Sequence, residues 1–146
     1  MLGTKWQSVT GRLRSVSVGL AGVWGVSPRH EVMVRDGTWG LGGEAEGTGW
    51  TRVDGMMVSV ASGDNGMVWG VSEDGGLWYR SNVSQASPMG THWFRINDGL
   101  DMGWKNVALL GHNMWAIDSK DSLLVRDNVK QDNIQGRYCL TIMNQQ

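Results

Sequence analysis

The sequence predicts an all-β fold: a partial β-propeller of about three four-stranded antiparallel blades, with no significant helix. Nine of the 146 residues are tryptophan, and six of these recur with a period of about 45 residues. Short runs rich in β-branched and aromatic residues alternate with glycine, asparagine, aspartate and serine, as strands alternate with turns. No window has convincing helical periodicity. The recurring tryptophans are Trp6, Trp24, Trp50, Trp69, Trp93 and Trp115.

The tryptophan repeat divides the chain into three units, residues 6–35, 50–80 and 93–126, and we expect each unit to form one blade. Every unit opens on a tryptophan and contains four short runs, which is the number of strands in a propeller blade. Residues 64–66 read Asp-Asn-Gly, a sequence that supplies the positive φ angles of a tight hairpin. Residues 127–146 fall outside the pattern and are predicted to be a tail or the start of a further blade.

Composition argues against several classes of protein. Thirteen basic and fourteen acidic residues give a net charge of −1, so there is no electrostatic reason to expect nucleic acid or an anionic membrane as the partner. The single cysteine, Cys139, excludes an internal disulfide and fits a reducing compartment. No apolar run has the length of a signal peptide or a membrane span. The sequence therefore predicts a soluble, cytoplasmic protein.

Two connectors, residues 37–49 and 81–90, join the units and are predicted to be surface loops. Trp39 lies in the first connector and is the candidate for an exposed ring that stacks on a ligand. The mid-strand tryptophans have two interpretations, because large rings at one repeated position either fill the space between blades or form a platform for sugars. Packing is the favoured interpretation for Trp24, Trp69 and Trp115.

Arginines form a second repeated set. Arg52 and Arg95 follow the opening tryptophan of their units and are candidate ligand-binding residues. A further set follows the last apolar run of each unit, where arginine could bind phosphate groups or an acidic partner through bidentate hydrogen bonds. The alternative, which is favoured, is that cations on an outer strand keep a sheet edge soluble. This second set is Arg35, Arg80 and Arg126.

The sequence contains no pattern that indicates catalysis. His30, His92 and His112 have no metal-ligand spacing relative to one another or to the cysteine. No nucleophile elbow occurs, and no glycine-rich phosphate loop leads from a strand into a helix. We therefore predict a protein that is not an enzyme and that has no metal and no cofactor.

The repeated phrase Trp-x-x-Val-x-Gly, followed by Val-Ser-Val and Val-Trp-Gly-Val-Ser, resembles the tectonin β-propeller repeat, and the resemblance covers residues 6–126. Residues 87–93 and 114–120 are similar to the large animal tectonin repeat-containing proteins. That resemblance implies a scaffold in autophagy and lysosomal membrane traffic, in the cytoplasm and associated with autophagosome or lysosome membranes. The shorter branch of the family, fish egg lectins and fungal or slime-mould tectonins, implies the alternative of a lectin for glycans or bacterial lipopolysaccharide.

The number of units departs from this family. Its propellers close with more than three blades, usually six in the lectins, whereas three blades form an open arc with exposed sheet edges. We therefore expect a fragment, a truncated isoform or half of an assembly in which self-association completes the propeller. The expected partners are proteins, with a glycan as the alternative and no nucleic acid.

Overall fold

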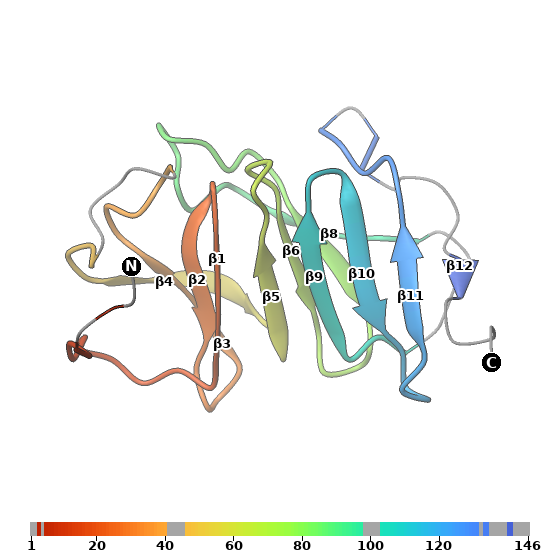
Figure 1. The fold of residues 1–146 in the computed structure, drawn as a ribbon, viewed down its shortest axis with the longest axis horizontal. Coiled ribbons are helices and arrows are strands. Elements are labelled where there is room, and N and C mark those ends of the chain that lie inside the picture. Colours follow the sequence, from red (N-terminus) through yellow and green to blue (C-terminus); the bar gives the residue numbers. More distant parts are fainter. Residues whose placement is uncertain are drawn as a thin grey trace.

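The computed structural model describes residues 3, 5–40, 46–97, 103–131, 133–134 and 140–141, which form three four-stranded antiparallel sheets (Figure 1). No helix occurs among these residues, so the all-β prediction is confirmed. The first sheet contains β1 (Ser15–Gly19), β2 (Gly22–Val26), β3 (Glu31–Arg35) and β4 (Trp50–Met56). The second contains β5 (Ser59–Ser62), β6 (Val68–Val71), β7 (Leu77–Arg80) and β8 (Trp93–Arg95). The third contains β9 (Asn106–Leu110), β10 (Asn113–Ile117), β11 (Leu123–Arg126) and β12 (Leu140–Thr141).

The boundaries of the sheets differ from the predicted blades. β4, which begins at Trp50, pairs with β3 and completes the first sheet, and β8, which begins at Trp93, completes the second. The connector after each third strand brings the chain back antiparallel to that strand, so the opening phrase of one unit is the fourth strand of the preceding sheet. β12 pairs with β11 in the third sheet, so these two residues of the predicted tail do not begin a further blade.

The first tryptophan phrase forms no strand. Trp6 is equivalent to the residues that open β4 and β8, yet residues 6–9 have no regular secondary structure and the Trp6 side chain is fully exposed, at 102%. In the first sheet, β4 pairs with β3. No strand of the described residues lies beside residues 6–9 in the same way. Without such a neighbour the backbone has no ladder to join.

The three sheets stand side by side in chain order, with the first and third sheets at opposite ends (Figure 1). β5 packs against β1 and β2, and β9 packs against β5 and β6. Trp24 and Trp69 are 0% exposed and fill the spaces between the first and second and the second and third sheets. Trp115, at the equivalent position of the third sheet, is 38% exposed because no described strand covers the far face of that sheet.

The backbones of the first and second sheets are in direct contact at Gly19. A β-carbon at this residue would lie 2.2 Å from the carbonyl oxygen of Ser62 in the next sheet. Three hydrogen bonds join the sheets here: Leu20 N donates to Gly63 O at 2.9 Å, Ser62 Oγ donates to Gly22 O at 2.8 Å, and Ser62 N donates to Ser17 Oγ at 2.9 Å. The sequence needs glycine at residue 19 because the two backbones are in direct contact.

Trp104, which has no counterpart in the sequence repeat, has one in the structure. Leu13, Met57 and Trp104 hold equivalent positions in the three sheets. In each sheet, the next residue along the chain donates its backbone N–H to the carbonyl oxygen of the last residue of the second strand. Met57 and Trp104 are buried between sheets, whereas Leu13 lies half-buried on the open side of the first sheet. The donor–acceptor pairs are Arg14 to Val26, Val58 to Val71 and Lys105 to Ile117.

Candidate binding surface

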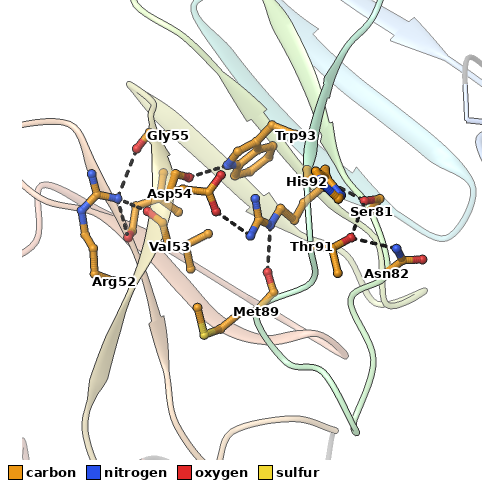
Figure 2. Close-up of polar contacts among 12 residues, drawn as sticks. Arg52, Val53, Asp54, Gly55, Ser81, Asn82, Met89, Thr91, His92 and Trp93 are labelled. Carbon is orange, nitrogen blue, oxygen red and sulfur yellow. Dashed lines mark hydrogen bonds and ion pairs between the residues drawn. The ribbon is translucent and has the colours of Figure 1, made fainter.

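Each fourth-strand tryptophan is hydrogen bonded to the phrase that precedes it by one unit. The Trp50 indole donates to Thr10 O at 2.7 Å, and the Trp93 indole donates to Asp54 O at 2.6 Å (Figure 2). These contacts link the outer edges of successive units. Trp50 and Trp93 are therefore structural tryptophans, whereas the side chain of Trp6 is fully exposed.

The glycine of the repeated phrase makes room for these indoles. Gly11 and Gly55 have φ angles of 130° and 96°, which side-chain-bearing residues rarely adopt. A β-carbon would lie 2.5 Å from the indole nitrogen of Trp50 at the first glycine, and 2.8 Å from that of Trp93 at the second. The tryptophan and the glycine of the repeat are therefore the two halves of one contact.

The arginines at the ends of the third strands, Arg35 and Arg80, contact the same two tryptophans. Arg35 Nε donates to Glu46 O at 2.7 Å, and Arg80 Nε donates to Met89 O at 2.8 Å (Figure 2). Each guanidinium also lies over the indole ring that opens the following fourth strand, at 5.2 and 5.3 Å. This geometry fixes the connector and the outer strand together.

Burial corrects the sequence-based interpretation of these arginines as surface cations. Arg80 is only 2% exposed and forms an ion pair with Asp54 at 2.8 Å. The hydrogen bond from the Arg80 guanidinium is the main cause that lowers the pKa of Asp54 below its ordinary value. Arg126 is likewise buried. Neither of the two interpretations drawn from the sequence applies to Arg80 and Arg126, since both side chains are buried, whereas Arg35 is half-buried.

The two connectors that follow β3 and β7 share a hydrogen-bonded frame. In each, the residue after the third-strand arginine exchanges backbone hydrogen bonds with the last residues before the fourth-strand tryptophan. The frame holds the base of each loop in one geometry. Its bonds are Asp36 N to Gly49 O, Thr48 N to Asp36 O, Ser81 N to His92 O and Thr91 N to Ser81 O.

The segments held by this frame differ from sheet to sheet. In the first connector, buried Thr38 accepts a hydrogen bond from Val23 N at 3.0 Å and so lies against the β1–β2 hairpin. In the second, Ser84 and Ser87 bond to each other through their backbones, and Asn82 Nδ2 donates to the Thr91 hydroxyl at 2.8 Å (Figure 2). We call residues 37–46 and 82–89 the connector inserts; residues 41–45 lie outside the described part.

Trp39 is not the exposed ring that the sequence predicts. Its side chain is half-buried and packs against the apolar cluster between the first two sheets. The ring reaches the β5–β6 turn, where a β-carbon on Gly66 would lie 3.7 Å from it. Glycine-rich surroundings in the sequence suggested exposure, but Gly40 N bonds to Leu20 O at 2.8 Å and folds this part of the insert back onto the sheets.

Arg52 and Arg95 occupy equivalent, exposed places on β4 and β8. Arg52 donates to Gly55 O at 3.2 Å and to the carbonyl of Val53 (Figure 2). The Nε atom of Arg52 also lies 3.4 Å from a Glu31 carboxylate oxygen. Both guanidinium groups therefore already have partners on the protein.

Arg95 pairs with an acid from the turn before the third strand. Its guanidinium lies 2.8 Å from the Asp74 carboxylate and 5.6 Å from the centre of the Trp78 ring. The acid that pairs with Arg52 also lies at the start of a third strand, whereas Trp39 follows the end of one. The structure therefore does not bring Trp39 together with the two arginines.

The Arg95–Asp74 ion pair should determine how the Asp74 carboxyl titrates. Hydrogen bonds from Arg95, then from Ser72, hold the pKa of the Asp74 carboxyl far below its ordinary value of 3.8. We expect Arg95→Gln to raise this pKa toward 3.8, and Arg52→Gln to leave it unchanged. NMR titration of the side-chain carboxyl measures both. Because the folded-state pKa is lowered, the pair stabilises the fold above about pH 4 and is lost only as the pH falls through the folded-state value.

Neither a metal cluster nor a membrane span is found in the described ranges. No three histidine, cysteine, aspartate or glutamate side chains of these residues gather as metal ligands would. Likewise, none of these residues belongs to a helix with the length and apolar character needed to cross a bilayer.

Comparison with known proteins identifies the family. The family model of the tectonin domain matches residues 2–119, which is most of the chain. The chain belongs to the tectonin family. The β-propeller prediction is therefore confirmed at the level of the family as well as by the three four-stranded sheets.

Three relatives of this tectonin chain cover different shares of it. It is 26% identical to the fish-egg lectin of Cyprinus carpio over 64% of the chain and 39% of that protein. It is 37% identical to the tectonin beta-propeller repeat-containing protein of Drosophila melanogaster over 56% of the chain and 6% of that protein. It is 27% identical to the perivitellin-2 31 kDa subunit of Pomacea maculata over 75% of the chain and 36% of that protein. The chain thus spans less than half the length of each relative.

A solved structure has a similar fold. The crystal structure of human WBSCR16 superimposes with a TM-score of 0.59 over 85% of this chain and 35% of that one, at 18% identity. This likeness concerns the arrangement of the strands alone.

Proposed function

We propose that this tectonin chain is a non-enzymatic interaction module that binds a protein partner through its connector inserts. The observation that carries the proposal is the shared frame, which holds two inserts of different sequence and structure in equivalent places. A rigid frame with variable loops is the usual way in which a repeat fold presents a binding surface.

The difference between the inserts favours a protein over a repeated glycan site. Repeated sugar sites need equivalent aromatic and polar groups in several units, whereas Trp39 is half-buried in one insert and the other insert carries no aromatic residue. The 37% identity to the Drosophila tectonin repeat-containing protein supports the same reading. Within this proposal, the module is a scaffold in autophagy and lysosomal membrane traffic and acts in the cytoplasm at those membranes.

A lectin is the second candidate, and one comparison favours it specifically. The chain is similar to a fish-egg lectin over 64% of its length. In a lectin of this architecture, exposed hydroxyl and amide groups such as those of Asn82 and Thr91 would contact a sugar.

The second insert provides a direct test. Gln85 and Ala86 are exposed at its tip, so Gln85→Lys with Ala86→Lys changes the surface without disturbing the frame. We expect this double variant to weaken binding to purified autophagy conjugation factors by about tenfold or more, since rim charges alter recognition. Affinity is measured by biolayer interferometry.

The matched control places the same charges elsewhere. Gln7→Lys with Ser8→Lys alters two exposed residues outside both inserts and should leave the affinity unchanged. A glycan array probed with the wild-type chain distinguishes the second candidate. The lectin would replace the scaffold as the proposed function if three results were obtained together. The wild-type chain would bind one glycan class saturably, the double insert variant would lose this binding, and the conjugation factors would not bind.

A further inference from the structure

The far side of the third sheet exposes several apolar side chains, and no described strand covers it. Trp115 is 38% exposed and Leu110 is 70% exposed, although both lie on the side of the sheet where the other sheets bury their tryptophans. Ile117, Leu123 and Val125 continue this face and are half-buried. We call these five residues the far face.

The near side of the first sheet also exposes apolar side chains, and no strand of the described residues covers it. Val16 is 58% exposed and Val18 is 71% exposed on β1. Leu13 and Val23 extend this surface and are half-buried. We call these four residues the near face. The near and far faces lie at opposite ends of the row of sheets (Figure 1).

The far face has the pattern of the surfaces that fill the two internal junctions. In each sheet, the tryptophan of the second strand pairs with an apolar residue of the third strand. The residue two positions after this tryptophan also pairs with an apolar residue of the third strand. In the first and second sheets these residues are buried against the following sheet. The equivalent pairs are Trp24–Val34, Trp69–Tyr79 and Trp115–Val125, then Val26–Val32, Val71–Leu77 and Ile117–Leu123.

The near face has the pattern of the surfaces that receive those tryptophans. Val16 pairs with Gly25 as Val60 pairs with Gly70, and Val60 is buried against the first sheet. Val18 occupies the position of Ser62 in the second sheet and of Leu109 in the third, and both of these contact the preceding sheet. The chain therefore exposes both halves of an interface that it forms twice internally.

From this complementarity we propose that a second copy of the chain covers both faces, with the far face of each copy docked on the near face of the other. The contact is head-to-tail, because the two faces differ and each is complementary to the other rather than to itself. Head-to-tail contacts close into a ring when the rotation between copies permits. Two copies joined in this way bury all four open faces at once, which an open row of copies cannot do.

One position in this contact departs from the internal junctions. Leu110 stands where Gly19 and Gly63 stand in the other sheets, at the end of the first strand. Gly19 lies against the backbone of the next sheet, so a leucine there holds the two first strands farther apart. The contact between copies is therefore wider at this end than the contact between the first two sheets.

The assembly is tested by placing one charge on either face. Val18→Asp introduces a carboxylate into the near face, and Trp115→Asp introduces one into the far face. Burial of an unpaired charge is strongly unfavourable, so each variant should weaken dimerisation by about 100-fold or more. Sedimentation velocity of the wild-type chain should show a dimer at micromolar concentration, and each variant should sediment as a monomer.

Mixing the two variants distinguishes head-to-tail contact from other arrangements. The Val18→Asp chain keeps an intact far face, and the Trp115→Asp chain keeps an intact near face, so an equimolar mixture should form a heterodimer through one contact. Recovery on mixing also shows that both variants are folded. Phe94→Asp is the matched control, because Phe94 is an exposed apolar residue on the middle sheet and should leave the dimer unchanged.

Three results would overturn the proposal. The first is a wild-type chain that remains monomeric at a concentration 100-fold above the one used. This result would mean that other segments or other proteins cover the near and far faces. The second is a Trp115→Asp chain that still dimerises, which would indicate contact between two near faces. The third is a mixture that remains monomeric although circular dichroism shows both variants folded. The assay contains no ligand, so it is independent of whether the connector inserts bind a protein or a glycan.

Discussion

Replacing Trp24 with alanine is expected to lower the free energy of unfolding by about 3–5 kcal/mol. The side chain is 0% exposed between the first two sheets, and its indole nitrogen donates to Ala21 O at 3.0 Å. Removal therefore leaves a large cavity between two sheets whose backbones are already in contact, so the space cannot collapse easily. Chemical denaturation followed by far-UV circular dichroism measures the loss.

Trp115→Ala is the matched control for this prediction. The residue occupies the equivalent place in the third sheet but is 38% exposed, and no described strand covers it. We expect a loss of about 1 kcal/mol, provided that the protein is dilute enough to prevent association from contributing. Equal losses for the two variants would contradict the assignment of Trp24 as the filling between sheets.

Replacing Gly19 with alanine is expected to lower the free energy of unfolding by about 3 kcal/mol. A β-carbon there would lie 2.2 Å from the carbonyl oxygen of Ser62 and 2.6 Å from that of Gly63. Backbone atoms in a paired strand cannot move aside as a flexible side chain can, so the two sheets must separate. Their separation weakens the bond from Leu20 N to Gly63 O. Thermal unfolding measures the change.

Gly111→Ala provides the comparison. Gly111 has a φ of 60° but no atom within 4 Å of the place of its β-carbon, so only backbone strain is added. The expected loss is about 1 kcal/mol. A Gly19→Ala variant as stable as Gly111→Ala would mean that the first two sheets are not in contact at this residue.

Much of the fold is predictable because the repeat aligns equivalent residues in each unit. The period of the tryptophans and the residue types between them were sufficient for the number of sheets and the absence of helix in the described part. The residues at which one sheet ends and the next begins were not predictable in this way. A repeat can be divided at any point, and only the hydrogen bonds of β4 and β8 show that Trp50 and Trp93 end a sheet rather than begin one.

The candidate site was harder to predict than the fold. Arg80 and Asp54 lie in different runs of the sequence, and their ion pair depends on the return of the second connector, which no local pattern describes. Trp39 was expected to be exposed because of its glycine-rich neighbours, yet those glycines allow the chain to fold back onto the sheets. A useful signal was present for one contact: the constant spacing of tryptophan and glycine in Trp6–Gly11 and Trp50–Gly55.

In the proposed dimer, the near and far faces of this chain are halves of the same interface that joins its own sheets. Ser17 and Ser62 lie in contact across the first junction, where Ser62 N donates to Ser17 Oγ at 2.9 Å. Their equivalents between copies are Ala108 on one chain and Val18 on the other. Both are exposed.

Cross-linking of these equivalents with a short bis-maleimide, in a Cys139→Ser background, tests the claim directly. We predict that an Ala108→Cys chain mixed with a Val18→Cys chain yields a cross-linked dimer. Either variant alone should yield none. The absence of a cross-linked dimer from the mixture would contradict the account, as would a dimer formed equally well by either variant alone.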